Sequence, residues 1–513
     1  MEGDSMFAWL RDEMARVICN LGEMTGIGAT GMVYRLCGKT IVQDWGVAIS
    51  RNGEVQIQST PAGNFLIGYL IDLINITHKH LDHMGAVIRL IVEHPEARVA
   101  ISRKALEGLK IMARDSLKIM RNNIREAQLN GFLVSEEIFT QADLDSFIEE
   151  AESGNGRIEI LDEDCWIEWP DWPGWHFGFC SAGHDDGARS FMFETPDGER
   201  VYATGDIASH DQEVPKGVML PDENFRGNFF DKPVVMVTEA TNGAKRERSW
   251  SYNKVRHVVS STDELDSQLE KICWQVKSRG GIVQIATFAG NRSSEMLLKV
   301  VRMGHKAVVD GLARDMVRVE IGEEKVNQLV ADGKLVIVGD KYRSLSSEDG
   351  KILVEAQREA IAKGEHGFVV VIAPSATLDQ GYSVFYAERT LPDSRNALII
   401  PGYLFPDSTS RQIMELDRGH TIKLNTFVRN KNGRGHHKQL SLVNVRCDVY
   451  HFDYTSHDFQ GALVERVKLV RPRKLIVHHC DDKAFVAYEQ ALRSVLDYPL
   501  EIVRAEHLKE IEL

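Results

Sequence analysis

Candidate metal ligands are concentrated in one short run of the chain, His78-x-His80-x-Asp82-His83. Three imidazoles and a carboxylate do not suit an ordinary hydrophobic core, because burying polar groups without partners is costly. On a loop that leaves a strand, alternate side chains of such a run can converge on one point. Imidazole and carboxylate groups are ligands that suit Zn²⁺ and similar divalent ions. The run therefore predicts a metal site.

Two later positions have the same chemical character. His184 follows Ala182-Gly183 at the expected end of a strand, and Asp206 follows Thr204-Gly205 where the next hairpin ends. The hairpin would bring His184 and Asp206 close together across its open end. A lone histidine after glycine, or a lone Thr-Gly-Asp turn, is more often structural. The three segments in this order, each after a strand, indicate a single site.

Strands and turns must position these segments. Residues 70–76 are expected to form a strand that leads into the histidine-rich run, and a helix should begin near Gly85. Residues 191–195 and 201–204 flank Pro196-Asp197-Gly198-Glu199, which is a strong hairpin-turn signal.

Residues 26–31 match the dinucleotide-binding pattern GxGxxG literally. That fingerprint needs a strand before it and a helix after it. The residues that follow alternate as in a strand. A glycine-rich bend between strands is therefore the better interpretation.

The remaining segments divide into an early part and a later part. The early part is expected to contain strands near 17–21, 32–36 and 40–44, a helical stretch over 103–152, and a strand entered from the aromatic-rich residues 166–179. From about residue 240 the pattern becomes strands alternating with helices, which is typical of a parallel sheet. Short strands are expected again at 447–453 and 474–478, around a helix at 463–470.

The composition is that of an ordinary globular chain. Of 513 residues, 43% are hydrophobic and 27% charged, with a formal net charge of −14, which excludes a disordered or collagen-like chain. The acidic balance argues against non-specific coating of nucleic acid. The longest apolar stretch, 65–71, is too short to span a membrane. The start shows no secretory pattern and the seven cysteines form no CxxC pair, so we expect a cytoplasmic location.

The HxHxDH run, the later histidine and the later aspartate together resemble the metallo-β-lactamase fold, in which such segments bind two metals at the edge of a ββ sandwich. The resemblance implies two Zn²⁺ ions per chain, with Mn²⁺ as an alternative. It implies that His78, His80 and His184 hold one metal and that Asp82 and His83 hold the second. Asp206 would bridge the two.

Motifs farther along the chain resemble those of the β-CASP nucleases. A buried strand ending at Glu239 resembles the acidic motif that follows the core, Thr455-Ser456-His457-Asp458 resembles the second motif, and Ile476-Val477-His478 resembles the third. Residues 285–292 and 402–411 resemble segments of the inserted domain, although one usual glycine is missing. The resemblance implies that His478 completes the ligand set of the second metal. In the family's third motif glycine commonly follows this histidine, whereas here His479 does. His479 is therefore left as the alternative to His478 as a metal ligand.

The resemblance spans roughly residues 17–485. It implies an α/β fold class, namely an αββα metallo-β-lactamase sandwich with an inserted β-CASP α/β domain. The expected boundaries are 1–240 for the first part of the core, 241–445 for the inserted domain and 446–513 for the segment that completes the core.

The activity implied is a two-metal hydrolase that cleaves phosphodiester bonds of single-stranded RNA by a metal-activated hydroxide, as an endonuclease, a 5′-exonuclease or both. The chain resembles RNase J-like enzymes and 3′-end-processing endonucleases most, and the histidine at 478 favours RNA over DNA. Asp82, His457 and Glu239 are the predicted catalytic residues. His457 would donate a proton or hold a phosphate oxygen, and Glu239 would orient a histidine.

Other hypotheses about the function stay open at this point. They are a DNA nuclease or a small-ester metallo-hydrolase on the same fold, and a non-catalytic RNA-processing scaffold. RNA is the expected partner, and a second copy of the chain or an RNA-processing complex is a further expected partner. No membrane association is expected. Ser408, Arg411, Arg434 and Lys438 are the candidate substrate-binding residues. The basic stretch that holds Arg434 and Lys438 fits an exposed, merely soluble hairpin tip equally well.

Overall fold

The computed structural model describes residues 16–20, 28–52, 55–59, 70–129, 137–154, 156–342, 348–429 and 436–513. Contacts between Cα atoms divide the chain into two compact units. The first unit comprises residues 1–211, 215–246 and 456–513, and the second comprises residues 212–214 and 247–455.

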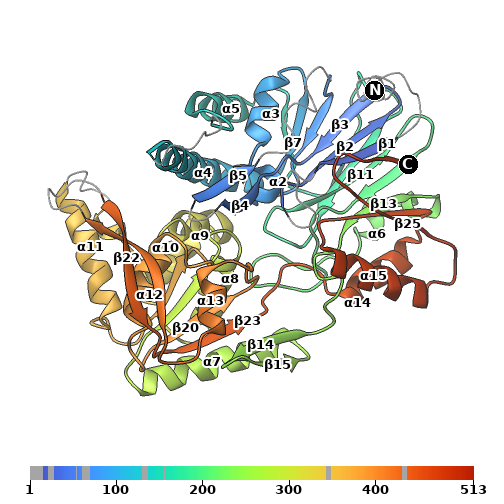
Figure 1. The fold of residues 1–513 in the computed structure, drawn as a ribbon. Helices are drawn as coiled ribbons and strands as arrows, with labels where there is room; N and C mark the ends of the chain where they lie inside the picture. The colour runs from blue at the N-terminus through green and yellow to red at the C-terminus, as the bar shows by residue number, and fades with distance from the viewer. Residues whose placement is uncertain are drawn as a thin grey trace. The chain divides into compact units, whose positions relative to one another are not determined.

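Two packed sheets form the first unit (Figure 1). One sheet has the strand order β26-β1-β2-β3-β6-β7-β8. In that order the strands span Glu510–Glu512, Arg16–Asn20, Gly31–Leu36, Lys39–Gln43, Leu73–Asn75, Arg98–Ile101 and Ile158–Ile160. The other sheet has the order β25-β24-β13-β12-β11-β10-β9. These strands span Glu501–Arg504, Lys474–His478, Val235–Glu239, Arg200–Ala203, Arg189–Glu194, His176–Ser181 and Cys165–Ile167.

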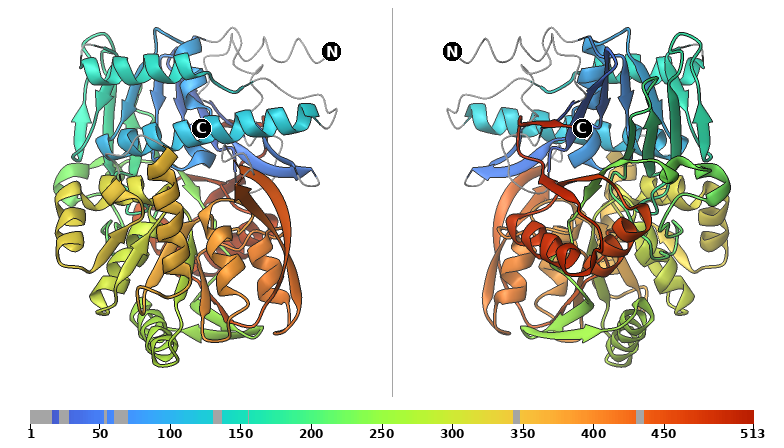
Figure 2. Two further views of the ribbon diagram at one scale, coloured as in Figure 1. Left: turned by 90° about the vertical axis from the view of Figure 1, so that its left-hand side faces the viewer. Right: turned by 90° about the vertical axis from the view of Figure 1, so that its right-hand side faces the viewer.

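Helices cover the outer faces of both sheets. Three pack on the first sheet, namely α3 (Val87–Glu93), α4 (Arg103–Leu129) and α5 (Gln141–Ser153). Two lie side by side on the second sheet, α14 (Gln460–Val470) and α15 (Asp482–Val495), drawn in red in Figure 2. Apolar side chains from both sheets, such as Tyr34 and Phe177, fill the space between them. This αββα layering confirms the predicted fold class.

Shorter elements complete the first unit. They are α2 (Leu81–Met84), the β4–β5 hairpin (Ala48–Asn52 and Val55–Ser59), α6 (Glu223–Arg226) and the 3₁₀ turn η1 (Phe229–Asp231). The last strand, β26, pairs with β1, so the C-terminal end of the chain completes the first sheet.

The second unit contains one large sheet with the order β15-β14-β23-β20-β16-β19-β17-β18. The strands span Val255–Val259, Arg248–Tyr252, Asp448–Phe452, Ala397–Pro401, Val283–Thr287, Val370–Pro374, Ala307–Val309 and Leu335–Ile337. From β23 to β18 all neighbours are parallel. The strand–helix alternation predicted after residue 240 is therefore confirmed.

Helices and one hairpin surround this sheet. The helices are α7 (Thr262–Ser278), α8 (Arg292–Arg302), α9 (Ala313–Ile321), α10 (Glu323–Ala331), α11 (Glu348–Ala362), α12 (Tyr382–Thr390) and α13 (Thr409–Glu415), with the 3₁₀ turn η2 (Asp340–Tyr342). The hairpin joins β21 (Thr421–Arg429) to β22 (His436–Asn444). Among the described helices of both units, none is long and apolar enough to cross a membrane.

Three details differ from or refine the predicted elements. The stretch 103–152 forms two helices rather than one, because the side chain of Thr140 caps a new helix by accepting from the Asp143 amide. Residues 28–30 of the GxGxxG segment bend into β2 rather than into a helix, as predicted, while residues 26 and 27 lie outside the described part. The strand at 448–452 pairs with β14 and β20 of the second unit, so the chain rejoins the first unit at Ser456 instead of residue 446.

Candidate metal centre

The backbone around β3 holds the histidine-rich run in place. Strands β3 and β6 are parallel neighbours, so the segments that follow them emerge at the same edge of the sheet. The amides of Thr30, Trp45 and Val47 donate to carbonyls of residues 81–83 over 2.7–2.9 Å. Gly46 is required there, because a Cβ atom at this position would lie 1.8 Å from the Asp82 carbonyl oxygen.

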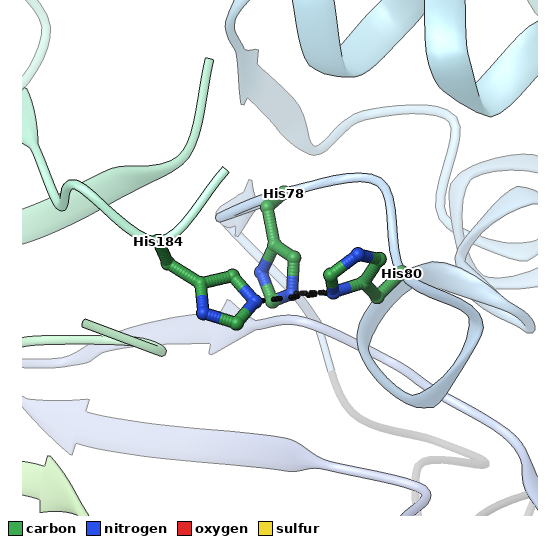
Figure 3. A group of neighbouring side chains, drawn as sticks. All are labelled: His78, His80 and His184. Atoms are coloured by element: carbon green, nitrogen blue, oxygen red, sulfur yellow. Dashed lines mark hydrogen bonds between the residues drawn. The ribbon is translucent and has the colours of Figure 1, made fainter. Parts of the chain in front are cut away.

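Three histidines converge on one point (Figure 3). Nδ1 of His80 lies 3.0 Å from Nε2 of His78 and 3.1 Å from Nε2 of His184. His78 and His80 come from the loop after β6, whereas His184 follows β10. Both His78 and His184 are 1% exposed. Three imidazole nitrogens at these distances are a ligand set that could hold a metal ion.

A second group lies beside this trio and shares Asp206 with it. Oδ2 of Asp206 is 3.7 Å from Nε2 of both His78 and His184, and 3.3 Å from Nε2 of His83. Oδ2 of Asp82 contacts Nε2 of His479 at 3.1 Å. Asp206 therefore lies between the two groups, and its bridging role stays a prediction of the resemblance.

His457 faces the same centre from the segment that re-enters the first unit. Its Nε2 is 4.0 Å from Oδ2 of Asp206, and its Nδ1 is 3.0 Å from Oε1 of Glu239. The other carboxylate oxygen of Glu239 accepts from the Thr241 amide. Burial lowers the pKa of His457, but the carboxylates of Glu239 and Asp206 outweigh it and raise the pKa to about 9. Glu239 thus orients His457.

Side chains outside these groups orient the imidazole rings, and sequence reasoning did not single them out. Asp44 accepts hydrogen bonds from Nδ1 of His83 and from the Thr77 amide and hydroxyl, all at 2.7–2.8 Å. The Thr77 hydroxyl in turn contacts Nδ1 of His78 at 2.9 Å, and the Ser456 carbonyl is 2.9 Å from Nδ1 of His184. Such partners set which ring nitrogen is available to a metal. Asp44 could have been found from its position in the sequence, because it directly follows β3 at the sheet edge where β6 ends.

Burial and neighbouring charges also set the protonation states of these side chains. Burial and the nearby imidazoles lower the pKa of His78 and His184 well below the usual value, so both are in the neutral form that binds a metal. Burial would raise the pKa of Asp206, but the charges of His479 and His83 outweigh it and hold that pKa well below its usual range. The aspartate is therefore ionised.

The donor set fits divalent metal ions. Five overlapping groups of three side chains bring their ligand atoms within 4.8 Å of one another, drawn from His78, His80, Asp82, His83, His184, Asp206, Glu239, His457 and His479. Buried polar atoms are rarely left unpaired, yet Oδ1 of Asp206 and Nε2 of His83 have no hydrogen-bond partner among the described residues. Metal coordination would satisfy both atoms.

His478, the predicted ligand, is not brought into these groups. It ends β24 opposite Glu239 of β13, it is 2% exposed, and both of its ring nitrogens lack a hydrogen-bond partner. His479 is in two of the groups. Its backbone has φ of 51°, a turn out of the strand that aims its ring at Asp82. The structure thus favours His479, the alternative left open by the sequence.

The predicted substrate-binding residues belong to the second unit. Ser408 is buried, and its hydroxyl accepts from the Arg411 amide as the N-cap of α13. The Arg411 side chain is 40% exposed and lies 3.8 Å from Glu415. Lys438 is in β22, with a side chain outside the described part, and Arg434 lies outside it altogether. A substrate role for these four residues stays a prediction.

Comparison with known proteins identifies relatives along most of the chain. No family model matches it. The chain is 21% identical to "Probable RNase MJ4" of Methanocaldococcus jannaschii over 90% of its own length and 92% of that protein. It is 20% identical to "Cleavage and polyadenylation specificity factor subunit 3-I" of Arabidopsis thaliana over 98% of its length, and 26% identical to "Ribonuclease TTHA0252" of Thermus thermophilus over 46%. These two matches span 64% and 44% of the relatives.

One solved structure shows the same fold. It is a protein of unknown function from Enterococcus faecalis, with a TM-score of 0.54 and 12% identity over 97% of this chain and all of that one. The two-unit architecture, the buried histidine–aspartate cluster and the extent of the sequence matches lead to one conclusion. The chain is distantly homologous, over most of its length, to β-CASP ribonucleases of the metallo-β-lactamase fold.

Proposed function

We propose that this protein is a two-metal ribonuclease that hydrolyses phosphodiester bonds of single-stranded RNA. The observation that carries the proposal is the position of Asp206 between two groups of ligand atoms, His78–His80–His184 and Asp82–His83–His479. Relatives whose names call them an RNase and an endoribonuclease each match 90% of the chain. This supports RNA rather than a small ester as the substrate.

The trio of histidines would hold one ion, and Asp82, His83 and His479 would hold the other. We propose Zn²⁺ as the ion, since nitrogen and carboxylate ligands suit it, with Mn²⁺ as the second candidate. When bound, the two ions would acidify a water and supply positive charge against the phosphate.

His457 has the position of a proton donor. Its Nδ1 is held by Glu239, which leaves Nε2 directed at the centre. In this place the imidazole can protonate the leaving oxygen or hold a phosphate oxygen, and such help is worth roughly 10²–10⁴-fold in rate.

Cleavage of 5′-labelled RNA and DNA of the same sequence tests the proposal. Wild type is compared with Asp82→Ala plus His83→Ala, and with the control Asp162→Ala plus His176→Ala, which alters exposed side chains of the same types. We expect RNA to be cut by wild type and control only. Single nucleotides from the 5′ end would identify an exonuclease, and longer fragments an endonuclease.

Two outcomes would contradict the proposal. Cutting that persists in the Asp82→Ala plus His83→Ala variant would separate the activity from the metal centre. DNA cleaved faster than RNA would make the protein a DNA nuclease, the alternative on this fold.

A further inference from the structure

A buried ion pair lies directly beside the histidine trio. Lys79, between His78 and His80 in sequence, pairs through Nζ with Oδ1 of Asp185, the residue after His184. The side chains are 1% and 0% exposed. Nζ of Lys79 also donates to the Asp186 carbonyl at 3.4 Å. The pair joins the two loops that carry the trio.

The helix next to this pair is shaped to accommodate it. Gly108 lies inside α4, where glycine is unfavourable relative to alanine. A Cβ atom at Gly108 would be 2.2 Å from Cδ of Lys79. The missing side chain therefore makes room for the aliphatic part of Lys79.

Asp185 also faces the ring of His80. Its second oxygen, Oδ2, has no hydrogen-bond partner within the described part of the chain and lies 3.9 Å from Nε2 of His80. The two other members of the trio each have a partner for the nitrogen that points away from the centre, the Thr77 hydroxyl for His78 and the Ser456 carbonyl for His184. For His80 that nitrogen is Nε2, and Asp185 is the carboxylate that faces it.

We infer that Asp185, held by Lys79, is a positioning residue for the metal centre. The carboxylate favours the form of His80 with its proton on Nε2, which leaves the lone pair of Nδ1 directed at the metal. Carboxylates beside metal-binding histidines act in this way, and their loss typically costs 10–100-fold in metal affinity. The inference rests on the proposed metal centre.

A purely structural cross-link is the competing explanation, and the chain offers a control for it. Lys104 of α4 pairs with Asp186 at 3.3 Å. This pair joins α4 to the same turn through Asp186, whereas the carboxylate 3.9 Å from Nε2 of His80 is that of Asp185. Loss of the Lys104–Asp186 pair should leave metal binding unchanged.

Metal titration of chelator-treated protein tests the inference. Zn²⁺ affinity is measured by competition with a chromophoric chelator, and the Co²⁺ form is followed by its visible spectrum. The variants are Lys79→Met plus Asp185→Leu, Asp185→Asn, and the control Lys104→Met plus Asp186→Leu. A buried ion pair replaced by apolar side chains of similar size is often neutral for stability, so the first variant should fold. Asp185→Asn keeps a neutral acceptor for Lys79 and removes the carboxylate charge that faces both His80 and Lys79.

We expect wild type and control to bind two equivalents of metal alike. Both Asp185 variants should bind one equivalent 10–100-fold more weakly, with an altered Co²⁺ spectrum, and the other equivalent normally. Wild-type affinity in Asp185→Asn would overturn the inference, whether or not the double variant folds, and the metal centre would stand. Wild type that binds no metal would overturn the proposed function as well.

Discussion

At the scale of single residues, the centre depends on which of two adjacent histidines is a ligand. His479 contacts Asp82 at 3.1 Å, whereas His478 ends a strand within the sheet. We predict that His479→Ala loses one of two metal equivalents and that His478→Ala keeps both. Metal analysis of the purified variants, made with Asn if the Ala variants unfold, measures this directly. Two equivalents in His479→Ala with one in His478→Ala would reverse the assignment.

The pairing of Glu239 with His457 makes a second prediction. Since Glu239 acts through His457, Glu239→Gln should lower kcat by about 10–100-fold, and His457→Ala by about 10²–10⁴-fold. Combining both changes should cost little more than His457→Ala alone. Metal content should be unchanged in all three variants. Effects that multiply in the double variant would show that the two residues act separately.

The sequence predicted well which ligand side chains come together. It predicted less well which residues hold those ligands in place. The HxHxDH run, His184 and Asp206 combine rare ligand types with strand ends, and such a combination is conspicuous in a sequence. Asp44 and Asp185 are single carboxylates of a common type, and only the fold shows that they face His83 and His80. The choice of His479 depends on its φ of 51°, which strand alternation does not reveal.

At the scale of elements, the loop before β4 and helix α2 must touch without side chains between them. A Cβ at Gly46 would lie 1.8 Å from the Asp82 carbonyl oxygen. Gly46→Ala should therefore lower the free energy of unfolding by about 1–3 kcal/mol and weaken metal binding. Gly461 in α14 has no atom within 4 Å of such a Cβ, so Gly461→Ala should be neutral or raise stability by up to about 1 kcal/mol. Urea unfolding compares the two variants.

The elements themselves were largely predictable because their hydrophobic patterns are strong. The hairpin of β11 and β12 and the helix at 460–470 follow directly from alternation and helical spacing. The separate start of α5 was missed, although the Thr140 side chain caps it by accepting from the Asp143 amide. The strand at 448–452 was expected, but its membership in the second unit depends on long-range pairing with β14 and β20, which local pattern cannot show.

At the scale of the whole molecule, metal binding should stabilise the folded chain. The ligands come from segments as far apart as His78 and His479, so an unfolded chain does not assemble the complete ligand set. With free metal at about 100 times Kd, linkage adds about 2.7 kcal/mol, and chelation should lower the Tm of the first unit by roughly 3–5 °C. Re-addition of Zn²⁺ should restore it. His80→Ala plus His83→Ala serves as the control, because its Tm should not respond to chelator. A wild-type Tm that does not respond either would contradict a structural contribution from metal.

The central claim is that the buried cluster is a two-metal centre, and anomalous X-ray diffraction at the zinc absorption edge tests it most directly. For crystals of the Zn²⁺-treated protein, we predict two anomalous peaks separated by Asp206. One should lie among His78, His80 and His184, and the other among Asp82, His83 and His479. Absence of peaks at the cluster, or a second peak beside His478 instead of His479, would contradict the account.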